Sequence, residues 1–447
     1  MTSDGHDDQS GTLAAASARG RWLIVAAVLG SGVAFLDGTV VNVALPAIAR
    51  DLDTDLRGQQ WVLDGYMLTL SALLLVGGVA GDRYGRRAVF IGGLVVFAVA
   101  SVGCALAPSI EWLVVARLVQ GVGAAAVVPG SLALINSEIA PDDRGAAVGL
   151  WAGMSGATSA LGPFVGGWLV DSVSWRGVFY LSVPLAVGAI WIALRHVPES
   201  RDQTEHARLD VLGAGTMILG LAGIIYALIE GPARGWSALS VGAAGVGCAA
   251  LVVFVIVELR VRDPLLPLSL FRSRQFTGAN LTTLLVYAAL GGALFLLALQ
   301  LQQSMGYSAL EAGAAMFPST VIMLFGSPLS GKIAQRTGPR LPMTVGPLVA
   351  AVGLGLMARA VPGVGYLGGV LPGVVMFGLG MTITVAPLTS AALALGSGFQ
   401  VAMIIAAACC AAGGLVALLT IRKGTGFRPQ VMPAVNSACQ DATTRTR

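Results

Sequence analysis

Long apolar runs dominate the chain, and polar residues are confined to the connections between them. A membrane-spanning helix needs about 20 mainly apolar residues. Thirteen runs of this kind lie near residues 22–46, 60–80, 88–107, 112–134, 146–170, 178–196, 211–230, 238–258, 277–302, 314–333, 341–360, 366–386 and 401–421. The alternating segments typical of a membrane β-barrel do not occur. The pattern predicts an all-α polytopic membrane protein with about thirteen spans.

Composition narrows the class of protein further. Hydrophobic residues make up 55% of the 447 residues and charged residues only 11%, against about 25% in an ordinary soluble domain. This excludes a cytosolic enzyme and a disordered regulator, and a net charge of +4 gives no basic face for nucleic acid. The five Cys are odd in number and show no metal-binding spacing, so we expect no metal and no other cofactor.

The basic residues predict the orientation of the spans, because loops rich in Lys and Arg face the cytoplasm. With a cytoplasmic N-terminus, the inner segments hold sixteen Lys and Arg and the outer segments hold five. Arg greatly outnumbers Lys, and with the many Ala and Gly this is typical of a GC-rich bacterial genome. We therefore expect a multi-pass protein of the bacterial plasma membrane.

The C-terminal part breaks this charge pattern. Thirteen spans place the tail outside, yet residues 422–447 carry five basic residues. The 387–400 segment, which would then lie inside, carries none. A span missing between about 387 and 400 explains both observations.

The polar connections divide the chain into five parts. The run at 22–46 is too long for a signal-peptide core, so it is expected to be a retained span. We predict a cytoplasmic tail at 1–21, a six-span bundle at 22–196, a central linker with two extra spans at 197–276, a C-terminal bundle of five spans at 277–421, and a tail at 422–447.

Three ionisable residues within the spans are candidates for proton coupling, because charge inside a membrane is costly and is retained where it has a function. Asp37 lies mid-span in the first run, Asp64 near the start of the second, and Arg117 in the fourth. A rise of 1.5 Å per residue places all three in the outer half of the membrane. Asp37 could exchange a proton if its distance from Arg117 changes. The alternative is a permanent ion pair that only holds helices together.

Polar and aromatic residues near these charges are candidates for a substrate pocket. Polar groups of this kind line a wet cavity or hydrogen-bond across helices, and aromatic side chains also occur at the lipid interface. Both interpretations stay open for the five candidates, which are Thr39, Asn42, Trp61, Tyr66 and Gln120.

The first inner loop, from Gly78 to Arg87, joins two glycines suited to a tight turn with an acidic residue at a helix end. Asp82 could bind a neighbouring helix N-terminus or an Arg and hold the inner side shut. A plain basic loop would explain the arginines but not this Asp. A gating role is therefore predicted for Gly78, Asp82, Arg83, Gly85 and Arg86.

The fifth run contains a second candidate for conformational change. Pro removes a backbone hydrogen bond and bends a helix, whereas Gly allows a neighbouring helix to come close. Generic close packing is the alternative. The residues concerned are Gly162, Pro163, Gly166 and Gly167.

One stretch looks like a nucleotide-binding loop and is not expected to be one. Residues 326–333 almost match the phosphate-binding pattern, but Ile333 replaces the Ser or Thr that would bind magnesium. We therefore expect no ATP binding. The loop resembles a degenerate copy of the Asp82 loop, which hints at a parallel internal repeat.

Together these motifs resemble the major facilitator superfamily, and specifically its fourteen-span drug:proton antiporters. Residues 36–46 are similar to the first-span signature of that subgroup, and residues 78–87 to the inner-loop motif, with Ala80 in place of the usual Leu. Arg117 with Gln120 is similar to the fourth-span motif, whose Arg is linked to proton transfer. Residues 162–167 are similar to the fifth-span motif of exporters, with Thr158 where a Gly is common.

The resemblance implies two helical bundles, two extra central spans and alternating access. The family layout has six spans after the extra pair, whereas this chain has five, and the acidic positions late in the family's second half have no match here. We therefore predict that the protein is no enzyme but exports lipophilic drugs or antibiotics across the plasma membrane in exchange for protons. A metabolite or nutrient transporter of the same fold, and a membrane protein that has lost transport, are the alternatives.

Overall fold

The computed structural model describes residues 13–201, 210–233, 235–261, 274–337 and 340–393, and these residues are almost entirely helical. The first six helices are α1 (Ala18–Asp51), α2 (Leu56–Tyr84), α3 (Arg86–Ala105), α4 (Ile110–Glu138), α5 (Pro141–Ser172) and α6 (Arg176–His196). Each contains one of the first six predicted spans, except that α3 ends two residues before the predicted end of the third. These helices pack against one another in a single bundle, with α1 contacting α4, α5 and α6.

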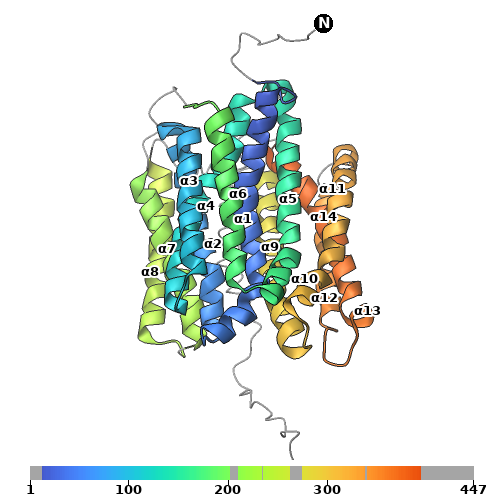
Figure 1. Ribbon diagram of the computed structural model, residues 1–447. Helices are drawn as coiled ribbons and strands as arrows, with labels where there is room; N and C mark the ends of the chain where they lie inside the picture. The colour runs from blue at the N-terminus through green and yellow to red at the C-terminus, as the bar shows by residue number, and fades with distance from the viewer. Residues whose placement is uncertain (1–12, 202–209, 234, 262–273, 338–339, 394–447) are drawn as a thin grey trace, which may run out of the picture.

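The remaining helices fall into a pair and a second group. The pair is α7 (Val211–Ala233) and α8 (Ala238–Arg260), which lie against each other, with α7 also packed on α2. The second group is α9 (Arg274–Leu299) with a π-helical turn at Gln300–Ser304, α10 (Ala309–Ala315), α11 (Phe317–Thr337), α12 (Arg340–Met357), α13 (Tyr366–Gly369) and α14 (Leu371–Leu393). Figure 1 shows the pair at one edge of the molecule and α10 to α14 at the opposite edge.

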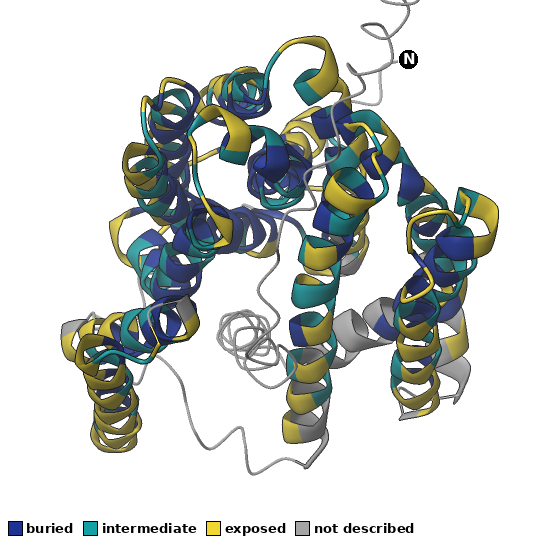
Figure 2. Cartoon of the chain, turned by 90° about the horizontal axis from the view of Figure 1, so that it is seen from below, coloured by how far each residue is buried: buried dark blue, intermediate teal, exposed yellow. Residues whose placement is uncertain are grey.

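The helices have the length and surface of membrane spans. Among the described residues, nine helices are long and apolar enough to cross a membrane by length and composition, and two shorter apolar helices lie at Leu341–Met357 and Leu371–Thr384. Large apolar side chains such as Val99 and Leu194 are more than half exposed. Figure 2 shows buried positions concentrated between the helices and exposed positions on the outward faces. The protein is an all-α polytopic membrane protein, as the apolar runs predicted.

Two predicted continuous spans are interrupted. The run at 314–333 includes the end of α10 and is broken at Met316, and the run at 366–386 is divided at Val370 into α13 and α14. Pro318 and Pro372 are the second residues of α11 and α14. Proline is tolerated at the start of a helix because its missing N–H is not needed there, so it favours a new helix at these points. The predicted span at 401–421, the missing span near 387–400 and the tail lie wholly or largely outside the described residues.

Close contact between helices rests on glycines that face a neighbour. A Cβ at Gly121 of α4 would overlap the Thr69 side chain and the Tyr66 carbonyl oxygen of α2, and one at Gly123 would lie 2.6 Å from the Phe97 nitrogen of α3. Small residues at such points let backbones approach, which is how helices associate where lipid removes the hydrophobic driving force. The Thr69 hydroxyl adds a hydrogen bond of 2.7 Å to the Leu118 carbonyl.

Enlarging Gly121 should therefore destabilise the first bundle. We expect Gly121→Ala to lower the free energy of unfolding by about 1–3 kcal/mol, the usual cost of overpacking. Gly92→Ala on α3, where a Cβ meets nothing within 4 Å, should be neutral or slightly stabilising. Thermal unfolding in detergent micelles measures both variants, and equal melting temperatures would contradict the role given to Gly121.

Candidate functional site

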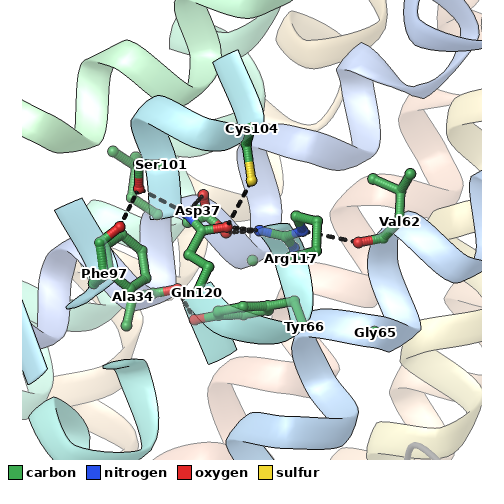
Figure 3. Close-up of polar contacts among 12 residues, drawn as sticks. Ala34, Asp37, Val62, Gly65, Tyr66, Phe97, Ser101, Cys104, Arg117 and Gln120 are labelled. Atoms are coloured by element: carbon green, nitrogen blue, oxygen red, sulfur yellow. Dashed lines mark hydrogen bonds and ion pairs between the residues drawn. The ribbon is translucent and has the colours of Figure 1, made fainter. Parts of the chain in front are cut away.

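A buried ion pair lies at the centre of the first bundle. The Arg117 guanidinium on α4 donates from Nη1 to the Asp37 carboxylate on α1, and neither side chain is exposed (Figure 3). The same guanidinium donates from Nε to the Val62 carbonyl oxygen of α2 over 2.8 Å. Three helices are thus joined through the Arg117 side chain.

Gln120 extends the pair into a network. Its side-chain nitrogen donates to Asp37 over 2.9 Å and to the Ser101 hydroxyl of α3 over 2.9 Å, while its oxygen accepts from Arg117 over 2.6 Å. The Cys104 thiol also points at this oxygen, at 3.7 Å. Ser101 and Cys104 were missed from the sequence, because a small polar residue in an apolar run gives no signal of which helix it faces.

Aromatic rings cover the guanidinium on the sides that carboxylate and amide leave open. The Arg117 Cζ lies 4.3 Å from the centroid of the Tyr66 ring and 5.9 Å from that of Phe179. The Tyr66 hydroxyl donates to the Ala34 carbonyl oxygen over 3.0 Å, which fixes the ring beside α1. Cation–π contacts of this kind stabilise a desolvated cation by about 2 kcal/mol.

The network can hold a charge in the membrane interior. A buried charge is tolerated when it is paired and hydrogen-bonded, and it becomes costly when its partner is removed. One donor of the guanidinium, Nη2, has no hydrogen-bond partner among the described residues, so Arg117 is not saturated by Asp37.

Asp64 does not belong to this network. It lies on α2, is only partly buried, and no hydrogen bond or ion pair joins it to another described residue. The sequence placed it at a similar depth to Asp37, but depth alone does not fix which side of a helix faces the partner. The three candidates for proton coupling therefore comprise one pair and one separate carboxylate.

The five candidates for a substrate pocket lie in different surroundings. Tyr66 and Gln120 are part of the buried network. Thr39 donates to the Ser159 carbonyl of α5 over 2.8 Å, and Asn42 donates to the Gly38 carbonyl of its own helix over 3.1 Å. Trp61 points away from the network, because its ring lies 6.2 Å from that of Tyr226 on α7. The structure therefore does not bring these side chains into one pocket.

The glycines and proline of the fifth span lie at two helix contacts. Gly162 and Gly166 face α1, where an added Cβ would meet Thr39 and Val40. Gly167 and Pro163 face α10, since a Cβ at Gly167 would meet the Ala309 carbonyl and one at Gly313 would meet the Pro163 carbonyl. The segment thus joins the first bundle to the second helix group.

Asp171 completes the contact between α5 and α10. Its carboxylate accepts from the Ala309 nitrogen over 3.2 Å and from the Leu310 nitrogen over 2.7 Å. These are unpaired donors of the first turn of α10, and an anion is favoured there by the helix dipole. Asp171 follows Gly167 by one helical turn, so a search for polar residues on the α10-facing side of the span could have found it.

The first inner loop folds on itself. Asp82 near the end of α2 binds Arg86, the first residue of α3, at 2.8 Å. Gly78 is buried in α2, Arg83 is exposed, and Gly85 has a φ of 112°, which favours glycine. The segment after α6 closes over this turn, since the Arg86 nitrogen donates to the Ser200 carbonyl and the Arg87 nitrogen to Glu199.

Among the described residues, the hydrogen bonds and ring contacts between the first bundle and the second helix group lie toward one end of the helices. They include α5 with α10, the Phe164 and Phe317 rings at 6.2 Å, and a hydrogen bond of 3.0 Å from Gln302 to the Val43 carbonyl of α1. By the charge pattern this is the predicted outer side. At the opposite end, Asp82 pairs with Arg86 inside the first bundle.

Comparison with known proteins decides the family. A sequence profile described as Major Facilitator Superfamily matches residues 27–418. The chain belongs to the major facilitator superfamily. Solved structures of this superfamily's general fold agree: a POT family transporter in complex with 5-aminolevulinic acid has a TM-score of 0.65 at 15% identity, and the match covers 90% of each chain. A bacterial homologue of the lysosomal transporter Spinster, inward-facing and unoccupied, has a TM-score of 0.57 at 16% identity, covering 89% of this chain and 81% of that one.

Several curated relatives are named as resistance, export or transport proteins. The tetracenomycin C resistance and export protein of Streptomyces glaucescens is 35% identical over 79% of this chain and 67% of the relative. The methylenomycin A resistance protein of Bacillus subtilis is 38% identical over 72% of this chain and 69% of the relative. The probable actinorhodin transporter of Streptomyces coelicolor is 35% identical over 84% and 67%. The matches span about two thirds of these relatives.

The buried pair makes a prediction for stability. Arg117→Leu leaves the Asp37 charge enclosed without a partner, so we expect the free energy of unfolding to fall by about 3–5 kcal/mol. The double variant Asp37→Asn with Arg117→Gln removes both charges and should recover most of this loss. Unfolding midpoints in the same detergent measure the difference. A double variant no more stable than the single one would show that the charge is not what costs stability.

The Asp171 contact makes a prediction for conformation. Asp171→Ala leaves two α10 donors without their carboxylate, so the outer ends of the two groups should separate more often. Spin labels on cysteines introduced at the exposed positions Val173 and Leu367 report this distance by pulsed electron resonance. We expect a second, longer distance in Asp171→Ala but not in Glu111→Ala, which removes an exposed carboxylate elsewhere at the same end. An unchanged distance distribution in both would exclude the contact as a gate.

Proposed function

We propose that this member of the major facilitator superfamily exports lipophilic drugs or antibiotics across the bacterial plasma membrane in exchange for protons. The observation that carries the proposal is the fully buried pair of Asp37 and Arg117, bridged by Gln120. The names of the relatives, which include resistance and export proteins for three antibiotics, support the direction of transport and the class of substrate.

The proton step follows from the chemistry of the pair. A protonated Asp37 is neutral and no longer holds the guanidinium by charge, so Gln120 and Arg117 are free to take other partners. A deprotonated Asp37 restores the pair and the contact between α1, α2 and α4. Because the pair lies at a junction of helices, a change in its charge biases how they pack, which is what coupling between two sites requires.

The contacts between the two helix groups support alternating access. The α5–α10 contact closes the predicted outer side, and Asp82 pairs within its own loop at the inner side. In the proposed cycle, substrate binds from the inside while Asp37 is ionised. The outer side then opens, a proton from outside neutralises Asp37, and substrate leaves. Return to the inward state delivers the proton to the cytoplasm.

The residues assigned to gating have a corresponding part in this cycle. The fifth-span glycines and Pro163 allow α5 to approach α1 and α10 closely, so they favour the closed outer side. The inner loop would engage the other group only when the outer side opens, and Asp82 would then exchange Arg86 for a partner there.

The proposal is tested by measuring proton movement driven by substrate. In proteoliposomes, adding a lipophilic antibiotic or cation should release protons from the wild-type protein. Asp37→Asn, which is neutral at every pH, should bring this release to the background level while the protein still folds and binds substrate. Full proton release in Asp37→Asn, or none in the wild type with any compound tested, would defeat the proposal.

Two further variants sharpen the result. Glu111→Gln removes an exposed carboxylate of α4, and it should release protons as the wild type does. Asp64→Asn tests the separate carboxylate on α2. A greater loss in Asp64→Asn than in Asp37→Asn would move the proton site away from the buried network.

A further inference from the structure

The face of α9 that meets the first bundle has open space near its middle. Tyr287 packs on the apolar cluster formed by α2, α7 and α8, and Phe295, eight residues later, packs on the cluster that contains Val40 and Val41 of α1. Gly291 lies four residues from each ring, so the three positions share one face of the helix. Gly291 is exposed, and a Cβ added there would meet no atom of the described residues within 4 Å.

This exposed glycine does not lie on the lipid side of α9. Leu285 and Leu296 are more than half exposed and mark the side toward lipid, while Leu290 packs on the core of the second helix group. At about 100° per residue, Gly292 lies on the lipid side with the two exposed leucines, whereas Gly291 lies roughly 120° or more from them. The space at Gly291 is therefore between α9 and the first bundle.

Asp64 of α2 lies at a similar depth on the other side of this space. Leu68, one turn farther inward on α2, belongs to the cluster on which Tyr287 packs. Residues four apart share a side of a helix, so Asp64 is on this side of α2 and one turn farther outward. Gly291 is likewise one turn outward from Tyr287, because α9 runs in the opposite direction to α2. The carboxylate and the open space are thus at corresponding levels.

The Asp64 carboxylate places a charge here that no described side chain pairs with. It is partly exposed, and no hydrogen bond or ion pair joins it to another described residue. Arg117 is fully buried against Asp37, and Arg57, about 10 Å outward along α2, pairs with two carboxylates of its own. A carboxylate at membrane depth is costly without a positive partner, so a cationic ligand would be stabilised at this place.

The same stretch of α2 also reaches the buried pair. Val62, two residues before Asp64, accepts from the Arg117 guanidinium through its carbonyl oxygen over 2.8 Å. A ligand that shifts α2 at Asp64 therefore moves an acceptor of Arg117 without touching the pair itself. A position of this kind is suited to a molecule whose binding is felt by Asp37.

We infer that the space between α2 and α9 binds a lipophilic cation with a flat ring system, its positive centre at Asp64 and its rings at Gly291, between Tyr287 and Phe295. The inference rests on the proposed export function and adds the chemical class of the substrate. The glycine leaves room for a ring against the helix, the two aromatic side chains suit a delocalised cation, and the carboxylate selects against neutral and anionic molecules.

The charge is tested with two dyes and the purified full chain in detergent micelles, by fluorescence anisotropy. The dye 10-methylacridinium is a permanent cation, and acridine has the same rings without a permanent charge. We expect Asp64→Asn to weaken binding of 10-methylacridinium by about tenfold, through loss of one charge contact, and to leave acridine binding unchanged. Asp64→Glu should keep the preference for the cation. An equal effect of Asp64→Asn on both dyes would overturn the assignment of the carboxylate.

The position of the rings is tested on the neighbouring glycines of α9. Gly291→Leu fills the open space and should weaken binding of both dyes by about tenfold. Gly292→Leu makes the same substitution on the lipid side, where a Cβ also meets no described atom within 4 Å, and it should bind both dyes as the wild type does. Equal affinities of the two variants, at equal melting temperatures, would place the dye elsewhere and overturn the site.

Failure of this site and failure of proton coupling give different results. With 10-methylacridinium at a saturating concentration, Asp64→Asn should still release protons in the liposome assay, because it has lost affinity and keeps the Asp37 pair. Asp37→Asn should bind the dye as the wild type does and release no protons. Absence of proton release from Asp64→Asn at saturation, with release intact in Asp37→Asn, would make Asp64 the proton site and overturn its role as the cation contact.

Discussion

A charge buried among helices in a membrane is costly unless an opposite charge pairs with it, and this requirement organises the first bundle. Asp37 and Arg117 satisfy each other across α1 and α4, while Val62 and Gln120 use the remaining hydrogen-bonding capacity of the pair. The helices cannot rotate independently without exposing one of these groups to an apolar surrounding. The pair is therefore a structural constraint that ties α1 to α4.

Close packing at small residues holds together the helices that the ion pair does not join. Glycines bring α2, α3, α4 and α5 close to their neighbours, so that a hydroxyl such as Thr69 can reach a carbonyl on the next helix. The α7–α8 pair is attached differently, by apolar contacts with α2 and by one buried carboxylate, Glu230, that holds two donors of α2. The two added helices are thus part of the same body as the first bundle.

The sequence predicted the order of the helices up to residue 393 well, because an apolar run of spanning length has no alternative to a helix in lipid. It also predicted the pairing of Asp37 with Arg117, since buried opposite charges at similar depth have few other partners. It could not place Asp64 or Trp61, because these depend on which face of α2 meets which neighbour. Ser101 and Asp171 were missed for a related reason: a hydroxyl in an apolar run, or an acid at a helix end, becomes informative only once the opposing helix is known. Pro318 and Pro372 indicate the helix breaks at Met316 and Val370. A hydropathy pattern does not show these breaks, because it is averaged over a whole span.

Asp171 recognises the main chain of α10 and no side chain on it. Any residue except proline at 309 and 310 presents the same two N–H groups, so the partner surface has no sequence signature of its own. The close approach of the two helices is set elsewhere on α10, at Gly313, where a Cβ would meet the Pro163 carbonyl oxygen. The contact between the two helix groups therefore requires an acid at 171 on α5, whereas on α10 it requires a small residue at 313 and no particular hydrogen-bonding side chain.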